Sequence, residues 1–376
     1  MKKLTTLLLA FVMVFSLAAC GAEKKTEEAK GDEGKTTEQG TEKEGENKDG
    51  EKKEAIKVSL VTDTGGIDDK SFNQSAWEGI QRFYVDNGMD AEGNSDYLQS
   101  SAEADYVPNL STFADDKKDL IVAPGFFFAN AMAEVAGNYP DQKFLLIDAV
   151  LEEPKDNVVS ATFAENEGSF LVGVVSALKA QEAGKTKVGF IGGKDFPVIQ
   201  NFEAGFEAGV AAVDPNMEVL VEYADTFEDS AKEQTIASKM YDKGCYVIFH
   251  ASGGAGKGLF KEAMDRVKNG EDVWACGVDK DQYLDGIYDE KEQKSIILTS
   301  MMKKVDVAAQ DVSQAVLDGK FKGGQTLLFN LENKGVGLPE INPNLKDEWV
   351  EKADEFAKKI VSREIKVSST PKRLEK

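Results

Sequence analysis

The feature that most constrains the fold is a regular alternation of short apolar runs with longer amphipathic segments. The apolar runs have the length of strands and are rich in Val, Ile, Leu and Phe, which is typical of strands buried on both faces of a parallel sheet. Between them, apolar residues recur at three- and four-residue spacing, the pattern of helices with one buried face. Strands are predicted at 57–62, 120–123, 144–147, 158–163, 188–191, 219–223, 246–249, 273–278, 295–298 and 326–329, and helices at 71–85, 130–137, 167–181, 200–213, 231–243, 257–269 and 305–317.

The alternation runs through once between about residues 57 and 165 and again between about residues 166 and 279. Two such halves predict an α/β fold of two doubly wound parallel-sheet lobes, with a hinged cleft between the carboxyl ends of their sheets. The expected N-terminal lobe comprises residues 55–165 and 282–322, and the C-terminal lobe comprises residues 166–281 and 323–362, with a tail at 363–376. Hinge strands are expected near residues 163–167, 279–283 and 323–326.

The first 54 residues follow a different pattern. Lys2 and Lys3 precede an apolar stretch at 7–17 that is too short to span a bilayer, and small residues then lead into Cys20. This predicts a lipoprotein signal peptide at 1–19 and attachment of diacylglycerol, with fatty chains such as palmitate, to Cys20; an ordinary secretion signal with an incidental cysteine is the alternative. Residues 21–54 contain no aromatic residue, Val, Ile or Leu, so we expect a disordered charged tether after Cys20. The folded part would then be lipid-anchored to the cell membrane on its extracytoplasmic face.

Composition excludes several classes of function. The formal net charge of −22 opposes binding to nucleic-acid backbones. A single histidine and three cysteines leave little material for a catalytic zinc site or a Ser-His-Asp triad, and we predict neither a metal nor a cofactor. That histidine, His250, ends an apolar run and is expected to be structural. Cys245 and Cys276 could pair, but buried free thiols are favoured because a chain of this size needs no disulfide to stabilise it.

Three of the predicted strands run directly into an aspartate, at Asp63, Asp148 and Asp279. Because the carboxyl ends of parallel strands face the cleft, these carboxylates are candidate acceptors for a ligand that carries several O–H and N–H donors. Each one alone could equally be a turn residue or a helix N-cap. Their recurrence at three equivalent places favours the ligand interpretation.

Two aromatic residues lie where predicted helices begin, one in each half of the chain: Phe72 and Phe227. The first turn of a helix that follows a strand points at the cleft, so the two rings could enclose a flat ligand such as a purine. The alternative is that each ring is a hydrophobic staple that fixes the entry of its helix.

Seven segments of the chain resemble the basic membrane protein family of substrate-binding lipoproteins, which includes the purine nucleoside receptors of ABC transporters. They are TDTGGIDDKSFNQ at 62–74, APGF at 123–126, LID at 146–148, GFIGG at 189–193, ASGGAG at 251–256, GVD at 277–279 and TSMMK at 299–303. The resemblance implies the fold of type I periplasmic binding proteins. It also implies capture of nucleosides such as guanosine, inosine or adenosine and delivery to a membrane permease, with no enzymatic activity and with the protein acting as a monomer.

The resemblance further implies a set of ligand-binding residues. Phe72 and Phe227 would sandwich the base, while Asp63, Thr64 and Asn73 would stand at its edge. The ribose would be bound by Asp148, Asp279 and Lys303, and Gly253 and Gly254 would let the backbone approach the sugar. Thr64 stands where an asparagine can follow the first aspartate in the family, so the preferred base stays open.

Other functions compete with that of a nucleoside receptor. The segment at 251–258 resembles a phosphate-binding loop but has Ala251 in the first glycine position and Gly258 in place of the final hydroxyl residue, so a nucleotide hydrolase is rejected. A nucleoside hydrolase that works through clustered carboxylates, and a sugar receptor in which Phe72 and Phe227 stack on a pyranose, remain as alternatives.

Overall fold

The computed structural model describes residues 54–341 and 343–375. The predicted signal peptide, the lipidated Cys20 and the tether up to residue 53 lie outside the described residues. None of the helices in the described part is long and apolar enough to cross a bilayer.

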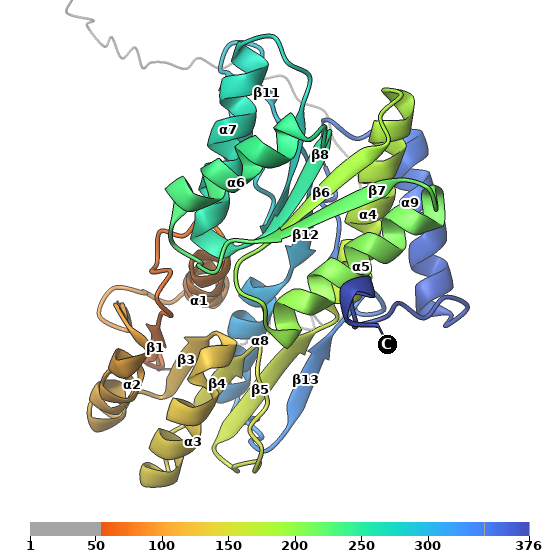
Figure 1. The fold of residues 1–376 in the computed structure, drawn as a ribbon. Helices are drawn as coiled ribbons and strands as arrows, with labels where there is room; N and C mark the ends of the chain where they lie inside the picture. Colours follow the sequence, from red (N-terminus) through yellow and green to blue (C-terminus); the bar gives the residue numbers. More distant parts are fainter. Residues whose placement is uncertain (1–53, 342, 376) are drawn as a thin grey trace, which may run out of the picture. The chain divides into compact units, whose positions relative to one another are not determined.

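The first sheet has six parallel strands in the order β13-β5-β4-β3-β1-β2 (Figure 1). Helices α1 and α8 pack together over one face, and α2 and α3 pack over the other. Its strands are β1 (Val58–Val61), β2 (Ser95–Leu98), β3 (Leu120–Pro124), β4 (Phe144–Ile147), β5 (Val158–Phe163) and β13 (Thr326–Phe329), and its helices are α1 (Phe72–Asp86), α2 (Tyr106–Asp115), α3 (Ala129–Asn138) and α8 (Val305–Leu317).

The second sheet has the order β14-β12-β9-β8-β6-β7, in which β14 alone runs antiparallel to its neighbour. Helices α4, α5 and α9 lie over one face of it, while α6 and α7 cover the other. Its strands are β6 (Lys187–Gly192), β7 (Glu218–Tyr223), β8 (Val247–Ala251), β9 (Trp274–Asp279), β12 (Ile297–Lys303) and β14 (Val336–Gly337), and its helices are α4 (Glu165–Glu182), α5 (Pro197–Val213), α6 (Ser230–Asp242), α7 (Lys257–Lys268) and α9 (Asp347–Val361). A small hairpin of β10 (Ile287–Asp289) and β11 (Lys294–Ser295) precedes β12.

The two sheets share one topology, because β1 to β5 occupy the same positions in the first sheet as β6 to β9 and β12 occupy in the second. The predicted class, two doubly wound α/β lobes, is therefore confirmed. The prediction omitted β2, β10, β14, α2 and α9. The β2 strand has the sequence SDYL and lies at the edge of its sheet with two exposed positions, so it lacks the apolar run that marks the central strands.

The chain crosses between the lobes at three places. The first crossing, at Ala164 between β5 and α4, matches the expected one. The second lies at Lys304 between β12 and α8, not near 279–283, and the third lies at 330–335 between β13 and β14, not at 323–326. Backbone hydrogen bonds connect the third crossing to the other two. Ala164 N donates to Phe329 O at 2.8 Å, and Lys304 N donates to Gly335 O at 2.9 Å.

These crossings correct the expected lobe boundaries. The sequence predicts residues 282–322 in the N-terminal lobe, but β12 within that range pairs with β9 of the second sheet. It predicts residues 323–362 in the C-terminal lobe, but β13 pairs with β5 of the first sheet. Sequence periodicity defines a strand locally, whereas its lobe is decided by which long-range partner it pairs with.

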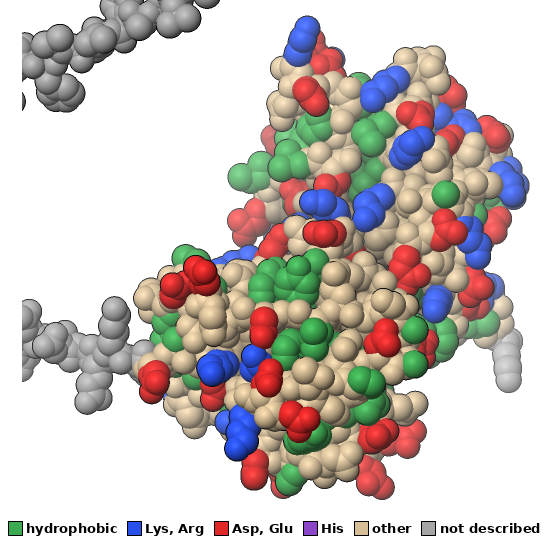
Figure 2. All heavy atoms as spheres, turned by 90° about the vertical axis from the view of Figure 1, so that its left-hand side faces the viewer, with side chains coloured by type: hydrophobic (Ala, Val, Ile, Leu, Met, Phe, Trp, Pro, Cys, Tyr) green, Lys and Arg blue, Asp and Glu red, His purple; other side chains and the backbone are tan. Residues whose placement is uncertain are grey.

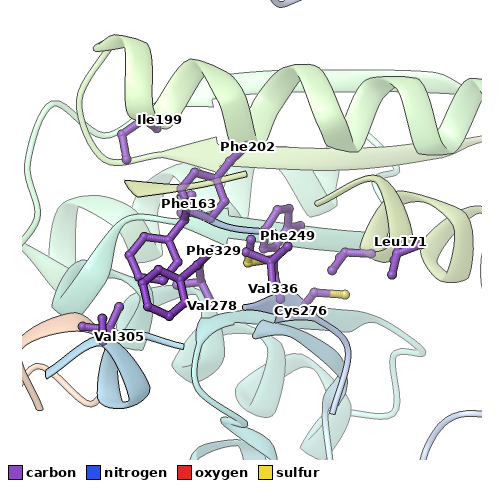
Figure 3. Packing of buried hydrophobic residues seen from close by; sticks show 14 of the residues in the cluster. Phe163, Leu171, Ile199, Phe202, Phe249, Cys276, Val278, Val305, Phe329 and Val336 are labelled. Carbon is purple, nitrogen blue, oxygen red and sulfur yellow. The ribbon is translucent and has the colours of Figure 1, made fainter. Parts of the chain in front are cut away.

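Aromatic packing supports the crossing region. Phe163 ends β5 and Phe329 ends β13, and their rings stack with centroids 5.0 Å apart and planes inclined by 22° (Figure 3). Both side chains are nearly fully buried, so apolar packing fixes the ends of β5 and β13 directly before the chain crosses to the other lobe. Packing of this kind confines any hinge motion to the few residues that follow.

Helices α4 and α8 follow two of the crossings, and glycines allow each of them to pack closely against a neighbouring helix. A Cβ atom on Gly79 of α1 would lie 2.1 Å from the carbonyl oxygen of Asp306 in α8. In the second lobe, a Cβ on Gly205 of α5 would lie 2.1 Å from Asn166 O, and one on Gly209 would lie 2.0 Å from Phe170 O, both in α4. A side chain at any of these positions would push the paired helices apart.

We expect Gly209→Ala to lower the free energy of unfolding by roughly 1–3 kcal/mol, the usual cost of overpacking a close contact. Urea unfolding followed by circular dichroism measures it. The matched control is Gly137→Ala in α3, where the added Cβ meets only the end of the Lys155 side chain at 3.5 Å. Alanine favours the helix by about 0.5–1 kcal/mol over glycine, so this control should lose no stability. Equal effects of the two substitutions would contradict the close-packing interpretation.

Candidate ligand-binding site between the two lobes

A cavity of about 600 Å³, including its opening to solvent, lies between the carboxyl ends of the two sheets. It contains nine of the ten residues that the sequence singled out, contributed by both lobes: Asp63, Phe72, Asn73, Asp148, Phe227, Gly253, Gly254, Asp279 and Lys303. The tenth, Thr64, is not among the lining residues; its hydroxyl donates a hydrogen bond to the Glu228 carboxylate of the other lobe.

A network at the start of α1 positions Asp63 in the cavity. Asp69 accepts hydrogen bonds from the backbone N–H groups of Ser71 at 2.9 Å, Asn73 at 2.8 Å and Gln74 at 3.1 Å, and so caps the helix. The Asn73 amide then donates to Asp63 Oδ1 at 2.7 Å and to Asp69 Oδ2 at 3.0 Å. Burial raises the pKa of Asp63 to about 7, against the opposing effect of the Asn73 hydrogen bond.

Lys303, the last residue of β12, is the charged centre of the cavity. Its side chain is only 2% exposed, and its Nζ lies 2.5 Å from Asp148 Oδ2 and 3.4 Å from Glu165 Oε1. Burial by itself would lower the pKa of Lys303, but the attraction of Asp148, Glu165 and Asp279 outweighs it and raises the pKa to about 12. The surrounding carboxylates therefore favour the protonated, positively charged form of Lys303.

Aromatic rings surround the same ammonium group. The Lys303 Nζ lies 5.0 Å from the ring centroids of Phe72 and Phe163 and 5.4 Å from that of Phe202. The negative faces of such rings attract a cation within about 6 Å. The rings also exclude water, which strengthens the ion pair with Asp148.

Asp148 and Asp279 hold equivalent places at the ends of β4 and β9, and both have left-handed backbone conformations, with φ of 67° and 68°. A non-glycine residue in this region carries strain that persists where the surroundings fix it, often at functional sites. Asp148 Oδ1 is buried and accepts no hydrogen bond from the described residues, so it is available to a ligand donor. Asp279 accepts a hydrogen bond from the Ser71 hydroxyl, and burial raises its pKa to about 6.

The rings of Phe72 and Phe227 both line the cavity, one from each lobe. Gly193 makes room for Phe227, since a Cβ there would lie 2.2 Å from that ring. Gly253 has a φ of +55° and lies beside the same ring. Gly254 differs, because a Cβ there would make only ordinary contacts from 3.4 Å outward.

A second group of residues that the sequence did not predict also lines the cavity. Asp69, Gly65, Gly125, Phe126 and Phe127 come from the first lobe, and Val198, Ile199, Phe202, Ala251 and Val278 come from the second. Val198 and Ile199 were missed because the helix was expected to begin at Gln200, whereas it begins at Pro197 with Phe196 as its N-cap. Proline at the first helical position was the available signal. Phe202 lies within the predicted helix, but its period does not show which side faces the cavity.

The loop at 68–71 ties the first lobe to the second around the cavity. Lys257 Nζ donates to Asp68 O at 3.2 Å, and Gln282 Nε2 donates to Lys70 O at 3.0 Å. The Gln282 carbonyl in turn lies 3.3 Å from Nε2 of His250, which is fully buried and outside the cavity lining. His250 therefore has the structural role that the sequence predicted.

Two further predictions concern reactive side chains. Cys245 and Cys276 are free and buried, as favoured from the sequence, and burial raises the pKa of both thiols to about 12. Within the described residues, no group of three or more His, Cys, Asp or Glu side chains could hold a metal ion.

Comparison with known proteins identifies the family. Residues 56–371 match the family described as ABC transporter substrate-binding protein PnrA-like. The chain belongs to this family. It is 44% identical over 319 residues to a CD4+ T-cell-stimulating antigen of Listeria monocytogenes, covering 84% of this chain and 88% of the relative. It is also 40% identical over 300 residues to the ABC transporter nucleoside-binding protein BmpA of Lactococcus lactis, covering 78% of this chain and 84% of that protein.

A solved structure has a similar fold. An ABC transporter solute-binding protein from Aeropyrum pernix superimposes with a TM-score of 0.74 at 27% identity, covering 84% of this chain and 94% of the other. The chain is thus a substrate-binding protein of an ABC transport system, and its lobes have the type I arrangement that the resemblance implied. Basic membrane protein A of Borreliella burgdorferi, at 30% identity, covers 85% of this chain and 90% of that relative.

The raised pKa of Asp63 predicts a pH dependence of stability. An unfolded aspartate titrates near pH 4, so between about pH 4 and 7 the folded state binds a proton that the unfolded state releases. The stabilisation is complete below about pH 4 and is lost as the pH rises through about 7. The stability of the unsubstituted protein minus that of Asp63→Asn should fall over this range in urea titrations of the ligand-free protein. Asp141→Asn, at an exposed site, is the control. If the stability of Asp63→Asn changed with pH in parallel with that of the unsubstituted protein, the raised pKa of Asp63 would be contradicted.

Proposed function

We propose that this protein captures purine nucleosides outside the cell and delivers them to the permease of an ABC transporter. The observation that carries the proposal is that one cavity has an aromatic wall from each lobe and, beside these walls, a buried carboxylate oxygen of Asp148 to which none of the described residues donates a hydrogen bond. A nucleoside has the matching chemistry, with a flat base joined to a sugar that offers hydroxyl donors. The nucleoside-binding relative from Lactococcus lactis supports the same ligand class.

The base would lie between Phe72 and Phe227. Stacking on aromatic rings contributes roughly 1–3 kcal/mol per base and is available to every base because each has a π face. Asp63, which Asn73 holds in place, would accept a hydrogen bond from an N–H of the base, or donate one when protonated. Thr64 does not line the cavity, so it would not contact the base as the sequence led us to expect. Its hydrogen bond to Glu228 would instead help to hold the two lobes together.

The ribose would lie at the charged end of the cavity. Asp148 and Asp279 would accept hydrogen bonds from its hydroxyl groups, and Lys303 would donate to a hydroxyl oxygen. The ion pair of Lys303 with Asp148 fixes the cation before the ligand arrives, which reduces the ordering cost of binding.

Capture by such a protein requires that it stay near its permease. A diacylglycerol on Cys20 and the charged tether at 21–54 would hold the folded lobes at the extracytoplasmic face of the membrane as a monomer. Acidic and basic side chains are interspersed on the face in Figure 2, which does not suit a nucleic-acid backbone. Relatives are named lipoproteins and basic membrane proteins, which supports the anchor.

Mass spectrometry of the small molecules released when the purified protein is denatured tests the ligand class. A purine nucleoside supports the proposal, and a sugar without a base would replace it with a sugar receptor. Incubation with inosine and guanosine then tests for an enzyme: unchanged, bound nucleoside supports a receptor, whereas release of free base would show a nucleoside hydrolase.

Phe72→Ala should weaken nucleoside binding by roughly 1–3 kcal/mol, because it removes one stacking surface. Isothermal titration calorimetry with guanosine measures the loss. The control is Phe321→Ala, at a partly buried phenylalanine outside the cavity lining. Unchanged affinity in Phe72→Ala would remove that ring from the base site.

Asp279→Ala should reduce the affinity for ribonucleosides more than the affinity for free bases, since a free base has no sugar hydroxyl to donate to Asp279. Parallel titrations with guanosine and guanine measure the two effects. Equal losses for both ligands would exclude Asp279 from the ribose site.

A further inference from the structure

The C-terminal residues 367–375, the C-terminal strap, pack along α5 beside the second lobe (Figure 1). The sequence placed them in a plain tail. In the structure, Asn166 Nδ2 donates to Val367 O at 3.0 Å, and Lys372 N donates to Glu207 Oε2 at 2.8 Å. Val367 and Pro371 are buried. The strap therefore touches the start of α4, directly after the first crossing, and one side of α5.

Arg373 makes the strongest contacts of the strap. Its two terminal nitrogens bind Asp195 end-on, with Nη2 2.6 Å from Oδ1 and Nη1 3.0 Å from Oδ2. Its Nε donates to both oxygens of Glu203, at 2.9 Å and 3.1 Å. The Glu203 side chain is fully buried, and besides Arg373 it accepts a hydrogen bond from the Tyr223 hydroxyl at 2.5 Å. Loss of the guanidinium would leave a buried carboxylate without a counterion.

Helix α5 connects these contacts to the cavity. Val198, Ile199 and Phe202 from its first turns line the cavity, while Glu203 and Glu207 on another side of the same helix bind the strap. Asp195 immediately precedes Phe196, the N-cap of α5. Arg373 thus binds both the loop that leads into α5, at Asp195, and the second turn of α5, at Glu203.

Phe196 lies on the cavity-lining rings of the first lobe. Its ring centroid is 5.3 Å from that of Phe126 and 5.1 Å from that of Phe127, and both partners line the cavity. Phe126 also meets the Phe227 ring edge-on at 6.3 Å. These contacts join the two lobes through aromatic side chains beside the cavity.

We propose that the C-terminal strap is a positioning element of the binding site. Through Arg373 it fixes Asp195 before α5 and Glu203 in the second turn of that helix. Phe196, which lies between them in the chain, then closes against Phe126 and Phe127, and a bound ligand is retained. The positioning stands on the protein contacts alone, and its effect on a nucleoside rests on the proposed function. Arg373 is a positioning residue, because it acts through Asp195 and Glu203 and does not line the cavity.

The first experiment compares Arg373→Ala with Lys372→Ala in the full chain. Both substitutions remove one positive charge from the strap, but the Lys372 contact is made by its backbone. Hydrogen–deuterium exchange without ligand should be faster in Arg373→Ala at residues 196–203, where Gln200 N bonds to Phe196 O at 2.9 Å, and unchanged in α7. Equal exchange at 196–203 in both variants would overturn the positioning role, whether or not the protein binds nucleosides.

The second experiment measures guanosine dissociation by stopped flow. Arg373→Ala should release guanosine roughly three- to tenfold faster than Lys372→Ala, a range set by bidentate pairs that are only partly exposed. Arg373→Lys should recover only part of the loss, because an ammonium cannot bind both carboxylates in the same fork geometry. No binding of guanosine by the unsubstituted protein would count against the proposed function, and the exchange experiment would then decide the positioning role.

A double-mutant cycle separates positioning from general destabilisation. If Arg373 acts through Asp195, its replacement should change the dissociation rate much less in an Asp195→Asn background than in the unsubstituted protein. Additive effects of Arg373→Ala and Asp195→Asn would overturn that route. Urea unfolding of the single variants shows whether the second lobe has instead lost stability as a whole.

Discussion

The rest of the site depends on the buried ion pair between the Lys303 ammonium and its carboxylate partners. Lys303 ends β12 in the second sheet, one residue before a crossing, and pairs with Asp148 from the first sheet. Removing such a cation from water is costly unless carboxylates surround it, and Asp148, Glu165 and Asp279 provide that compensation. The three carboxylates come from both lobes and from the first crossing, so the charge balance of the cavity depends on the lobes being together.

Closure of the lobes uses a second set of contacts that surround this centre. Ser71 binds Asp279, Gln282 binds the Lys70 carbonyl and Thr64 binds Glu228, and each of these bonds joins one lobe to the other. Because each is short and polar, it is made in full only when the lobes meet. A ligand that bridges the same gap would favour the closed arrangement by adding contacts available in that arrangement alone.

The internal symmetry of the fold explains why the cavity has two similar walls. Asp148 and Asp279 follow equivalent strands with nearly the same left-handed φ, and Phe72 and Phe227 are contributed one by each lobe. The two walls nevertheless differ in support. The wall from the first lobe is supported by Asp69, which caps α1. The wall from the second lobe includes the start of α5, and another side of that helix binds the C-terminal strap.

The sequence by itself determined the α/β class and the two doubly wound halves, because strand and helix periods are local. It also placed Asp63, Asp148 and Asp279 at strand ends that face one cleft, and Phe72 and Phe227 where helices begin. The other four sequence-predicted residues of the cavity, Asn73, Gly253, Gly254 and Lys303, followed from the family resemblance. Only the tertiary structure decided the exchange of β12 and β13 between lobes, the place of Thr64 outside the cavity lining, and the contribution of α5 to the cavity wall. It alone showed that Arg373 reaches Asp195. The reason is that a short strand or a polar tail has the same local pattern whichever partner it meets, and that partner is selected by contacts between residues far apart in the chain.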